Sequence, residues 1–408
     1  MVDIKPFKGL RPRLDLVEKV AALPYDVSSE EEVKSKRVNP YSFYHITRSE
    51  IDITTGARLD SEEVYQKAKE NLQRFIAEGT LVQDEKECYY LYAITMNGRT
   101  QTGLVCVSSL SDYENGVIKK HEFTRPNRVL DRVNNILATQ SHNGLVFLAY
   151  KENATLSELF AQWKSEHQAE YDFVAEDGVG HTFWVINDEK TIEVIGQTFC
   201  EKVDSTYVAD GHHRSAAAFE AAKKMENSGD KTNYYLTCIF PDTEVQIMDY
   251  NRIVHDLNGN CPEDILRYLT RDFDVICQET AYQPVQEHEF GMYLAGKWYC
   301  LKAKPGTYNE NDAISVLDVS ILQENVLAPL FNITDPRLDE RLDFVGGIRG
   351  LSYLQDQVDS GKAAVAFSCF PVTMKALFEV SDNGNVMPPK STWFEPKTRD
   401  GLVIHLIS

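Results

Sequence analysis

The residues from Asp210 to Arg214 carry more chemistry than any other run of this sequence. They read Asp-Gly-His-His-Arg, and they lie between a β-branched strand pattern at 206–209 and an Ala-rich helix pattern at 215–225. A tight loop between a strand and a helix presents the free N–H groups and the positive dipole of the helix N-terminus. The position therefore predicts an anion site before any side chain is considered.

The side chains of this run suit a polyphosphate. Gly211 lets a ligand approach the backbone closely, and Arg214 can bind a phosphate through two N–H groups at once. His212 and His213 can donate hydrogen bonds or bind a metal, and Asp210 can hold a cation that bridges phosphates. The alternative interpretation is structural: Asp210 caps the helix, Gly211 makes the turn, and His213 and Arg214 are solvated.

A second candidate segment, Lys119–Arg132, is basic in an otherwise acidic chain. It holds two acidic residues and five basic ones, which are Lys119, Lys120, Arg125, Arg128 and Arg132. Five minus two gives a local charge of +3, which favours a multiply charged anion such as a nucleotide polyphosphate. Glu122, flanked by these cations, stays ionised and can act as a general base for a hydroxyl. The alternative is a solvated basic loop that enters a helix near Leu130.

The tail at 387–397 is too Pro-rich for regular structure, yet it carries Trp393, Phe394, Lys390 and Lys397. It lacks the glycines of a phosphate-binding P-loop. Two interpretations remain open: a clamp whose lysines reach a phosphate or carboxylate, or an aromatic staple that closes the fold.

Composition sets the limits on function. The chain has 408 residues, with 42 Lys and Arg against 62 Asp and Glu, and its formal charge is −20. An acidic surface disfavours non-specific binding to nucleic acid and to anionic membranes. Eight well-separated cysteines without a C-x-x-C pair indicate reduced thiols. The start of the chain lacks the pattern of a signal peptide, so we expect a cytoplasmic protein.

The elements that must position these residues form a mixed α+β pattern. The expected helices span residues 61–78, 130–139, 155–169, 215–225, 262–270 and 320–327. The expected strands span residues 88–96, 102–108, 144–150, 206–209, 233–240, 245–250, 293–303 and 361–370. The turn-rich stretch 258–263 is the best boundary, which predicts a core domain at 1–257 and an α/β domain at 258–408.

Four motifs in this order resemble one large prokaryotic family, the domain of unknown function numbered 1015. They are Pro24–Val27, Gly116–Glu122 with Thr124 and Asp131-Arg132, Asp210–Arg214, and Met387–Thr392. That family is similar to the ParB/sulfiredoxin superfamily, which includes free L-serine kinases that use ADP or ATP. The resemblance implies a ParB/sulfiredoxin-like nucleotide-binding core with an N-terminal elaboration. No cysteine occupies the sulfiredoxin position near His212, and no helix-turn-helix for DNA binding is recognisable.

The resemblance also implies roles for single residues. Glu122 is similar to the base that accepts the proton of the serine hydroxyl, and Asp210–Arg214 is similar to the loop of the serine kinases that cradles the phosphates. We expect Asp210, His212 and His213 to complete the catalytic set. Asp210 is the expected Mg²⁺ ligand. The expected nucleotide-binding residues are Gly211, His213, Arg214, His121, Thr124, Arg125, Arg132 and Lys390.

The sequence thus predicts a small-molecule phosphotransferase, with L-serine as the expected acceptor and ATP or ADP with Mg²⁺ as the donor. Two alternatives stay open. One is a non-catalytic nucleotide-binding regulator. The other is a metal-dependent hydrolase in which His121, His212 and His213, with Asp210 or Glu122, bind Zn²⁺ or Mn²⁺.

Overall fold

The computed structural model describes residues 1–53, 61–225 and 229–407, and the chain folds into two compact units. The first unit is Met1–Val245 together with Pro396–Ser408, and the second is Gln246–Glu395. The turn-rich stretch 258–263, which the sequence favours as a boundary, lies inside the second unit as the connection between a strand and a helix. The chain therefore enters the second unit earlier than the turn pattern indicates, and its end returns to the first.

The first unit is built on a nine-stranded mixed sheet. Its strands, in spatial order, are β6 (Ile118–Lys119), β11 (Thr206–Asp210), β8 (Val146–Tyr150), β12 (Tyr234–Pro241), β5 (Arg99–Ser109), β4 (Tyr89–Met96), β10 (Gly180–Ile186) and β9 (Tyr171–Val174), with β1 (Ile4–Lys5) beside β5. The β4–β5 hairpin turns at Asn97 and Gly98, both with positive φ, as the Asn-Gly pair predicts. Two small ribbons flank the sheet: β2 (Leu10–Pro12) with β3 (Leu81–Gln83), and β7 (Ser141–His142) with β21 (His405–Leu406).

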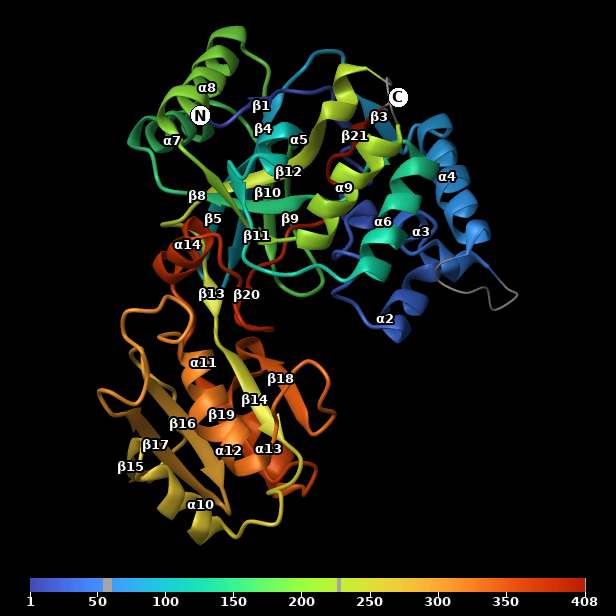
Figure 1. The fold of residues 1–408 in the computed structure, drawn as a ribbon. Coiled ribbons are helices and arrows are strands. Elements are labelled where there is room, and N and C mark those ends of the chain that lie inside the picture. Colours follow the sequence, from blue (N-terminus) through green and yellow to red (C-terminus); the bar gives the residue numbers. More distant parts are fainter. Residues whose placement is uncertain (54–60, 226–228, 408) are drawn as a thin grey trace. The chain divides into compact units, whose positions relative to one another are not determined.

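Two groups of helices flank this sheet (Figure 1). One group is α7 (Ala154–Glu166) and α8 (Glu189–Lys202). The other includes α4 (Glu62–Ala77), α6 (Pro126–Thr139) and α9 (His212–Lys224), and α6 packs on both α4 and α9. The remaining short helices are α1 (Val17–Val20), α2 (Glu30–Ser35), α3 (Tyr44–Thr47) and α5 (Leu110–Glu114). No helix in the described ranges is both long and apolar enough to span a membrane.

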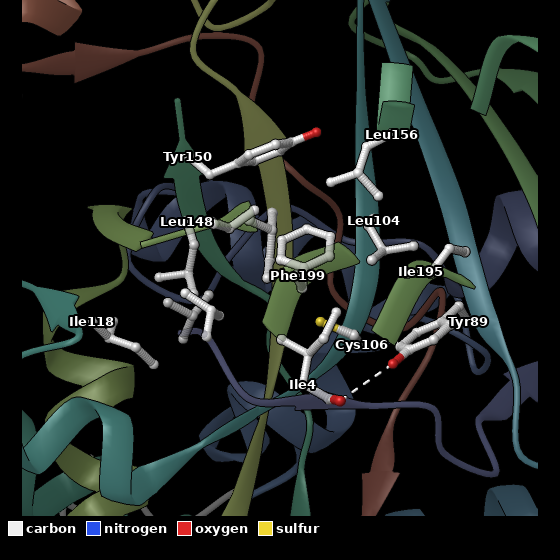
Figure 2. Close-up of a cluster of buried hydrophobic side chains, with 14 of the residues drawn as sticks. Ile4, Tyr89, Leu104, Cys106, Ile118, Leu148, Tyr150, Leu156, Ile195 and Phe199 are labelled. Carbon is white, nitrogen blue, oxygen red and sulfur yellow. Dashed lines mark hydrogen bonds between the residues drawn. The ribbon is translucent and has the colours of Figure 1, made fainter. Parts of the chain in front are cut away.

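The main core of the first unit lies between the sheet and the α7–α8 pair. Figure 2 shows Leu156, Ile195 and Phe199 of these helices meeting the strand side chains of Leu104 and Leu148, and all five are buried. Apolar burial of this kind contributes roughly 1.5–3 kcal/mol per large side chain. This packing holds the sheet in place. The sheet in turn positions the ends of β6 and β11, where the candidate site begins.

The second unit contains a six-stranded sheet in which neighbouring strands run antiparallel. In spatial order the strands are β15 (Phe273–Gln278), β17 (Lys297–Ala303), β16 (Glu289–Leu294), β19 (Val365–Cys369), β14 (Tyr250–Val254) and β18 (Leu342–Gly346). Its helices are α10 (Pro262–Leu269), α11 (Asp318–Leu322), α12 (Ala328–Phe331), α13 (Gly350–Asp359) and α14 (Met374–Asp382), with a π-helical segment at Gln323–Leu327 between α11 and α12. The chain is thus a mixed, α+β protein as predicted, but antiparallel pairing makes the second unit α+β and not α/β.

Two local predictions in the second unit are wrong. The expected strand at 293–303 is the β16–β17 hairpin, because Ala295 and Gly296 adopt positive φ and reverse the chain. The Pro-rich tail forms regular structure at β20 (Trp393–Phe394), which pairs with β13 (Ile247–Met248). Trp393 also packs edge-to-face on Tyr250 at 5.1 Å, as an aromatic staple would. The eight cysteines are free, in agreement with the absence of a C-x-x-C pair.

Candidate functional site

The topology of the sheet brings the two candidate motifs together. β6 and β11 are parallel neighbours, with Ile118 opposite Thr206 and Lys119 opposite Tyr207. Parallel strands end at the same edge of a sheet, so the residues that follow each strand meet there. The segment after β6 contains His121 and Glu122, and the segment after β11 is the Asp-Gly-His-His-Arg run.

Gly211 makes the sharp turn from β11 into α9. Its φ of +96° lies in the left-handed region that favours glycine, and no side chain caps the helix at this point. The helix begins at His212 and not at 215, so the two histidines and Arg214 form its first turn. The first intrahelical bond runs from Ser215 N to the Gly211 carbonyl, so the preceding N–H groups have no acceptor within the helix. The motif therefore sits on a helix N-terminus, as predicted.

Glu122 lies beside a pair of buried histidines. The His121 backbone N–H donates to Nε2 of His212 at 3.5 Å, and the two rings pack edge-to-face with centroids 4.5 Å apart. Burial lowers the pKa of His121 to about 4 and holds the pKa of His212 well below its usual value, so both rings are neutral at pH 7. With Nε2 as acceptor, the proton of His212 is assigned to Nδ1. That atom is 3.7 Å from Oε2 of Glu122, whose side chain is about half exposed.

His213 joins the N-termini of two helices. Its Nε2 accepts a hydrogen bond of 3.0 Å from the backbone N–H of Arg125, the residue that caps α6. Burial lowers the pKa of His213, and the nearby charge of Arg128 adds to this effect. The N-terminus of α9, the N-terminus of α6 and the exposed Arg125 and Arg128 side chains thus lie close together. At α6, Pro126 has no N–H, and the N–H groups of Arg125 and Arg128 are already hydrogen-bonded. The free N–H donors for an anion therefore come from α9, and α6 adds its dipole and the two guanidinium groups.

Asp210 is paired with a lysine from the far end of the chain. Nζ of Lys397 is 2.9 Å from Oδ2 of Asp210, and the two side chains are 13% and 29% exposed. Burial alone would raise the pKa of Asp210, but the charges of Lys397 and Arg214 outweigh it and hold the pKa well below its usual range. Asp210 is therefore a carboxylate at any physiological pH.

Arg214 points from the first turn of α9 into the interior. It is buried, and its Nη1 donates to the Leu145 carbonyl. Asp400 shares this environment: a Cβ added at Gly144 would meet both the Asp400 carboxylate at 3.1 Å and the Arg214 side chain at 3.3 Å. The two side chains line a small cavity of about 30 Å³, and burial raises the pKa of Asp400 to about 7 although Arg214 opposes the rise.

A large cleft of about 550 Å³ opens next to this cavity, and both are lined by Tyr25, Thr47, Arg132 and Asn135. Arg132 donates to Asp131 from two nitrogens at 2.9 and 2.8 Å, and its guanidinium packs on the Tyr25 ring at 4.0 Å. Arg128 at the start of α6 also lines the cleft. The cleft therefore borders the basic helix end and has room for a nucleotide-sized ligand.

The family of this chain follows from a match over most of its length. The family described as "Protein of unknown function (DUF1015)" matches residues 4–320. The chain belongs to this family. The match contains the first three of the four family motifs and ends within the second unit, before Met387–Thr392.

No curated protein matches the chain. Solved structures with similarity include a free serine kinase in complex with AMP, at 13% identity over 72% of this chain and 86% of that one, with a TM-score of 0.35. SbnI from Staphylococcus aureus, truncated at its C-terminus, has 12% identity over 72% and 85%, with a TM-score of 0.37. A conserved hypothetical protein from Pyrococcus furiosus has 13% identity over 73% and 93%, with a TM-score of 0.34. TM-scores of this size do not establish a shared fold.

The other predicted residues of this DUF1015 protein take different positions. Thr124 is partly buried in the segment between Glu122 and α6. Lys390 belongs to the second unit, where its carbonyl accepts from Arg252 at 3.0 Å and its ammonium lies 5.9 Å from the Tyr250 ring. Its role in nucleotide binding stays a prediction.

The described residues contain no cluster of three or more His, Cys, Asp or Glu that could hold a metal ion. The convergence of His121, His212, His213 and a carboxylate that a zinc or manganese hydrolase requires is therefore not found in this part of the chain. Asp210 offers one carboxylate to Mg²⁺, which keeps several waters and takes further ligands from bound phosphates. Because Lys397 pairs with Oδ2 of Asp210, only Oδ1 is left to hold the ion.

Sequence reasoning missed the acidic residues that face the motif. Asp26 lines the cleft and contributes to the electrostatic environment of His213, Arg214 and Asp400, whereas the sequence singled out Pro24–Val27 only as a family motif. Asp400 lies in a charged run near the chain end that matches no motif. For Asp26, the resemblance of Pro24–Val27 to the family was the one signal of a functional role. For Asp400, the sequence offered no such signal.

Proposed function

We propose that this protein is a nucleotide-dependent phosphotransferase that acts on a small hydroxyl substrate. The observation that carries the proposal is the meeting of two helix N-termini with a general-base candidate, Glu122, at one edge of the sheet. Phosphoryl transfer requires mainly that the reactants are positioned and that their negative charge is neutralised. The N–H groups of α9, together with Arg125 and Arg128, supply that neutralisation where the polyphosphate would bind.

Glu122 is suited to act as the base. Its side chain is 48% exposed, so a substrate hydroxyl can reach it, and the assigned Nδ1–H of His212 faces its carboxylate. Because His212 is neutral and buried, it places no full charge beside the carboxylate that would weaken its basicity. Its Nδ1 lies 3.7 Å from Oε2 of Glu122, so a small movement of the half-exposed glutamate brings the two atoms within hydrogen-bond distance. His212 thus acts as a positioning residue for Glu122.

Mg²⁺ held at Asp210 would neutralise part of the phosphate charge. L-serine as the acceptor, ATP or ADP as the donor, and the ParB/sulfiredoxin-like identity of the core enter the proposal from the resemblance of the motifs. The cleft is lined by charges of both signs, with guanidinium groups at Arg48 and Arg132 and carboxylates at Asp26 and Glu50. Such a lining is compatible with a small zwitterion as ligand.

The test is a direct assay of the purified protein. With Mg²⁺, L-serine and either ATP or ADP, we expect O-phosphoserine to accumulate in proportion to the enzyme, as detected by mass spectrometry. Nucleotide binding without any phosphorylated product would replace the proposal by a non-catalytic nucleotide-binding role. Absence of both binding and product would refute it.

Glu122→Gln tests the base. Removal of a general base lowers kcat by about 10²–10⁴-fold, while the affinity for nucleotide should change little. Glu220→Gln on α9 is the matched control, because its side chain is 49% exposed and also lies in the first unit. Full activity of the Glu122→Gln variant would refute the assignment of the base.

A further inference from the structure

The last part of the chain is held tightly against the first unit where it passes the candidate site. We call residues 396–400 the return segment. The Pro396 carbonyl accepts from Nε2 of Gln101 at 3.2 Å, and the backbone N–H of Arg399 donates to the Tyr92 hydroxyl at 3.2 Å. The backbone of Asp400 exchanges two hydrogen bonds with Ala22, at 3.1 and 2.8 Å. The return segment is therefore fixed on both sides of Lys397.

A buried arginine adds a second anchor. Arg399 is 5% exposed, its Nε donates to Nε2 of His181 at 3.0 Å, and it forms an ion pair with Asp177. Burial, with a contribution from Arg399, lowers the pKa of His181 to about 3, so the imidazole accepts as a neutral ring. A buried guanidinium that is paired with a carboxylate and bonded to an imidazole is costly to displace. Arg399 therefore restricts the positions that its neighbour Lys397 can reach.

Lys397 and Asp400, on either side of Arg399, lie near the two charged residues of the Asp-Gly-His-His-Arg motif, Asp210 and Arg214. Lys397 contacts Asp210 at 2.9 Å, and Asp400 lies with Arg214 along the small cavity. Asp210 is immediately before Gly211, so its carboxylate stands beside the N-terminus of α9. An unpaired carboxylate at that point would repel an approaching phosphate, which the helix end would otherwise attract.

We propose that the return segment completes the phosphate site, and that Lys397 is the positioning residue through which it does so. The ammonium group neutralises the Asp210 carboxylate, so an anion meets the positive N-terminus of α9 without a competing negative charge beside it. The family match ends at residue 320, which leaves the return segment outside it. This inference rests on the proposed function, because it assumes that a nucleotide phosphate binds at α9.

The experiment measures the dissociation constant of ADP by calorimetry with the full-length protein in the presence of Mg²⁺. Lys397→Met removes the charge and keeps an apolar side chain of similar length, and Lys397→Arg keeps the charge. The matched control is Lys5→Met, because Lys5 also lies 2.9 Å from an aspartate, Asp230, in the first unit. Thermal unfolding midpoints of all variants show whether they are folded.

Loss of a charge-assisted contact should weaken ADP binding about tenfold or more in Lys397→Met. Lys397→Arg should recover most of the affinity, and Lys5→Met should bind as the unchanged protein does. Equal affinity of Lys397→Met and the unchanged protein would overturn the inference. So would an equal loss in Lys397→Met and Lys397→Arg, because charge would then not be the cause. If the unchanged protein binds no ADP, the proposed function fails first, and the inference fails with it.

Discussion

The carboxyl group of Asp400 should make the stability of the first unit depend on pH in an unusual direction. Burial raises its pKa from 3.8 to about 7, so the folded protein binds this proton more tightly than the unfolded chain does. The stabilisation is fully present below about pH 4 and is lost as the pH rises to 7. A shift of about three units at 1.36 kcal/mol per unit corresponds to about 4 kcal/mol of unfolding free energy.

Asp400→Asn is the perturbation that isolates this effect. Asparagine has nearly the same shape and does not titrate, so the variant should lack the decline in stability between pH 4 and pH 8. The unfolding free energy of the variant minus that of the unchanged protein should therefore increase by about 4 kcal/mol over this range. The substitution also changes contacts with Arg214, which shifts the unfolding free energy by the same amount at every pH. This shift does not alter how the difference between the two proteins changes with pH.

Urea unfolding at a series of pH values measures the quantity. Replacing Trp298 and Trp393 of the second unit by Phe leaves the tryptophans of the first unit as the fluorescence signal. Asp172→Asn, at an exposed aspartate of β9, is the control for aspartate replacement in the same unit. If the curves of Asp400→Asn and the unchanged protein stay parallel within about 1 kcal/mol from pH 4 to pH 8, the assigned burial effect is wrong.

Three further changes have defined outcomes. Gly211→Ala places a side chain at a φ of +96°, with Cβ only 3.1 Å from Nε of Arg214, so urea unfolding should show a loss of about 1–3 kcal/mol and calorimetry a weaker affinity for ADP. His213→Ala removes the acceptor of the Arg125 N–H, and the unfolding free energy should fall by about 1 kcal/mol, whereas an unchanged value would mean that water replaces the ring without cost. Gly296→Val strains the β16–β17 turn at a φ of +77°, and it should lower the unfolding midpoint of the second unit while ADP binding is unchanged.

Local patterns predicted the elements that hold the site. The helix predicted at 61–78 is α4 (Glu62–Ala77), the Asn97-Gly98 pair forms the hairpin turn, and the strand pattern before Asp210 forms β11. These signals depend on hydrophobic period and on turn chemistry, which act over a few residues. The same local reasoning missed the turn at Ala295 and Gly296, because the flanking residues read as one continuous apolar strand.

Long-range contacts could not be predicted in this way. The position of Glu122 beside His212 follows from the parallel pairing of β6 with β11, which no local pattern specifies. The contact of Lys397 with Asp210 joins residues that are 187 positions apart. Such contacts arise from tertiary packing, and one sequence carries no direct signal for them.

The most direct test of the central claim is a crystal structure with ADP and Mg²⁺. We predict that the terminal phosphate of ADP accepts hydrogen bonds from the backbone N–H groups of His212 and His213, with Arg125 or Arg128 alongside and the Glu122 carboxylate facing the same space. Phosphates bound elsewhere in the first unit, with the N-terminus of α9 left empty, would contradict this assignment of the phosphate site. One such place is the cleft of about 380 Å³ lined by Lys19, Lys36 and Arg399.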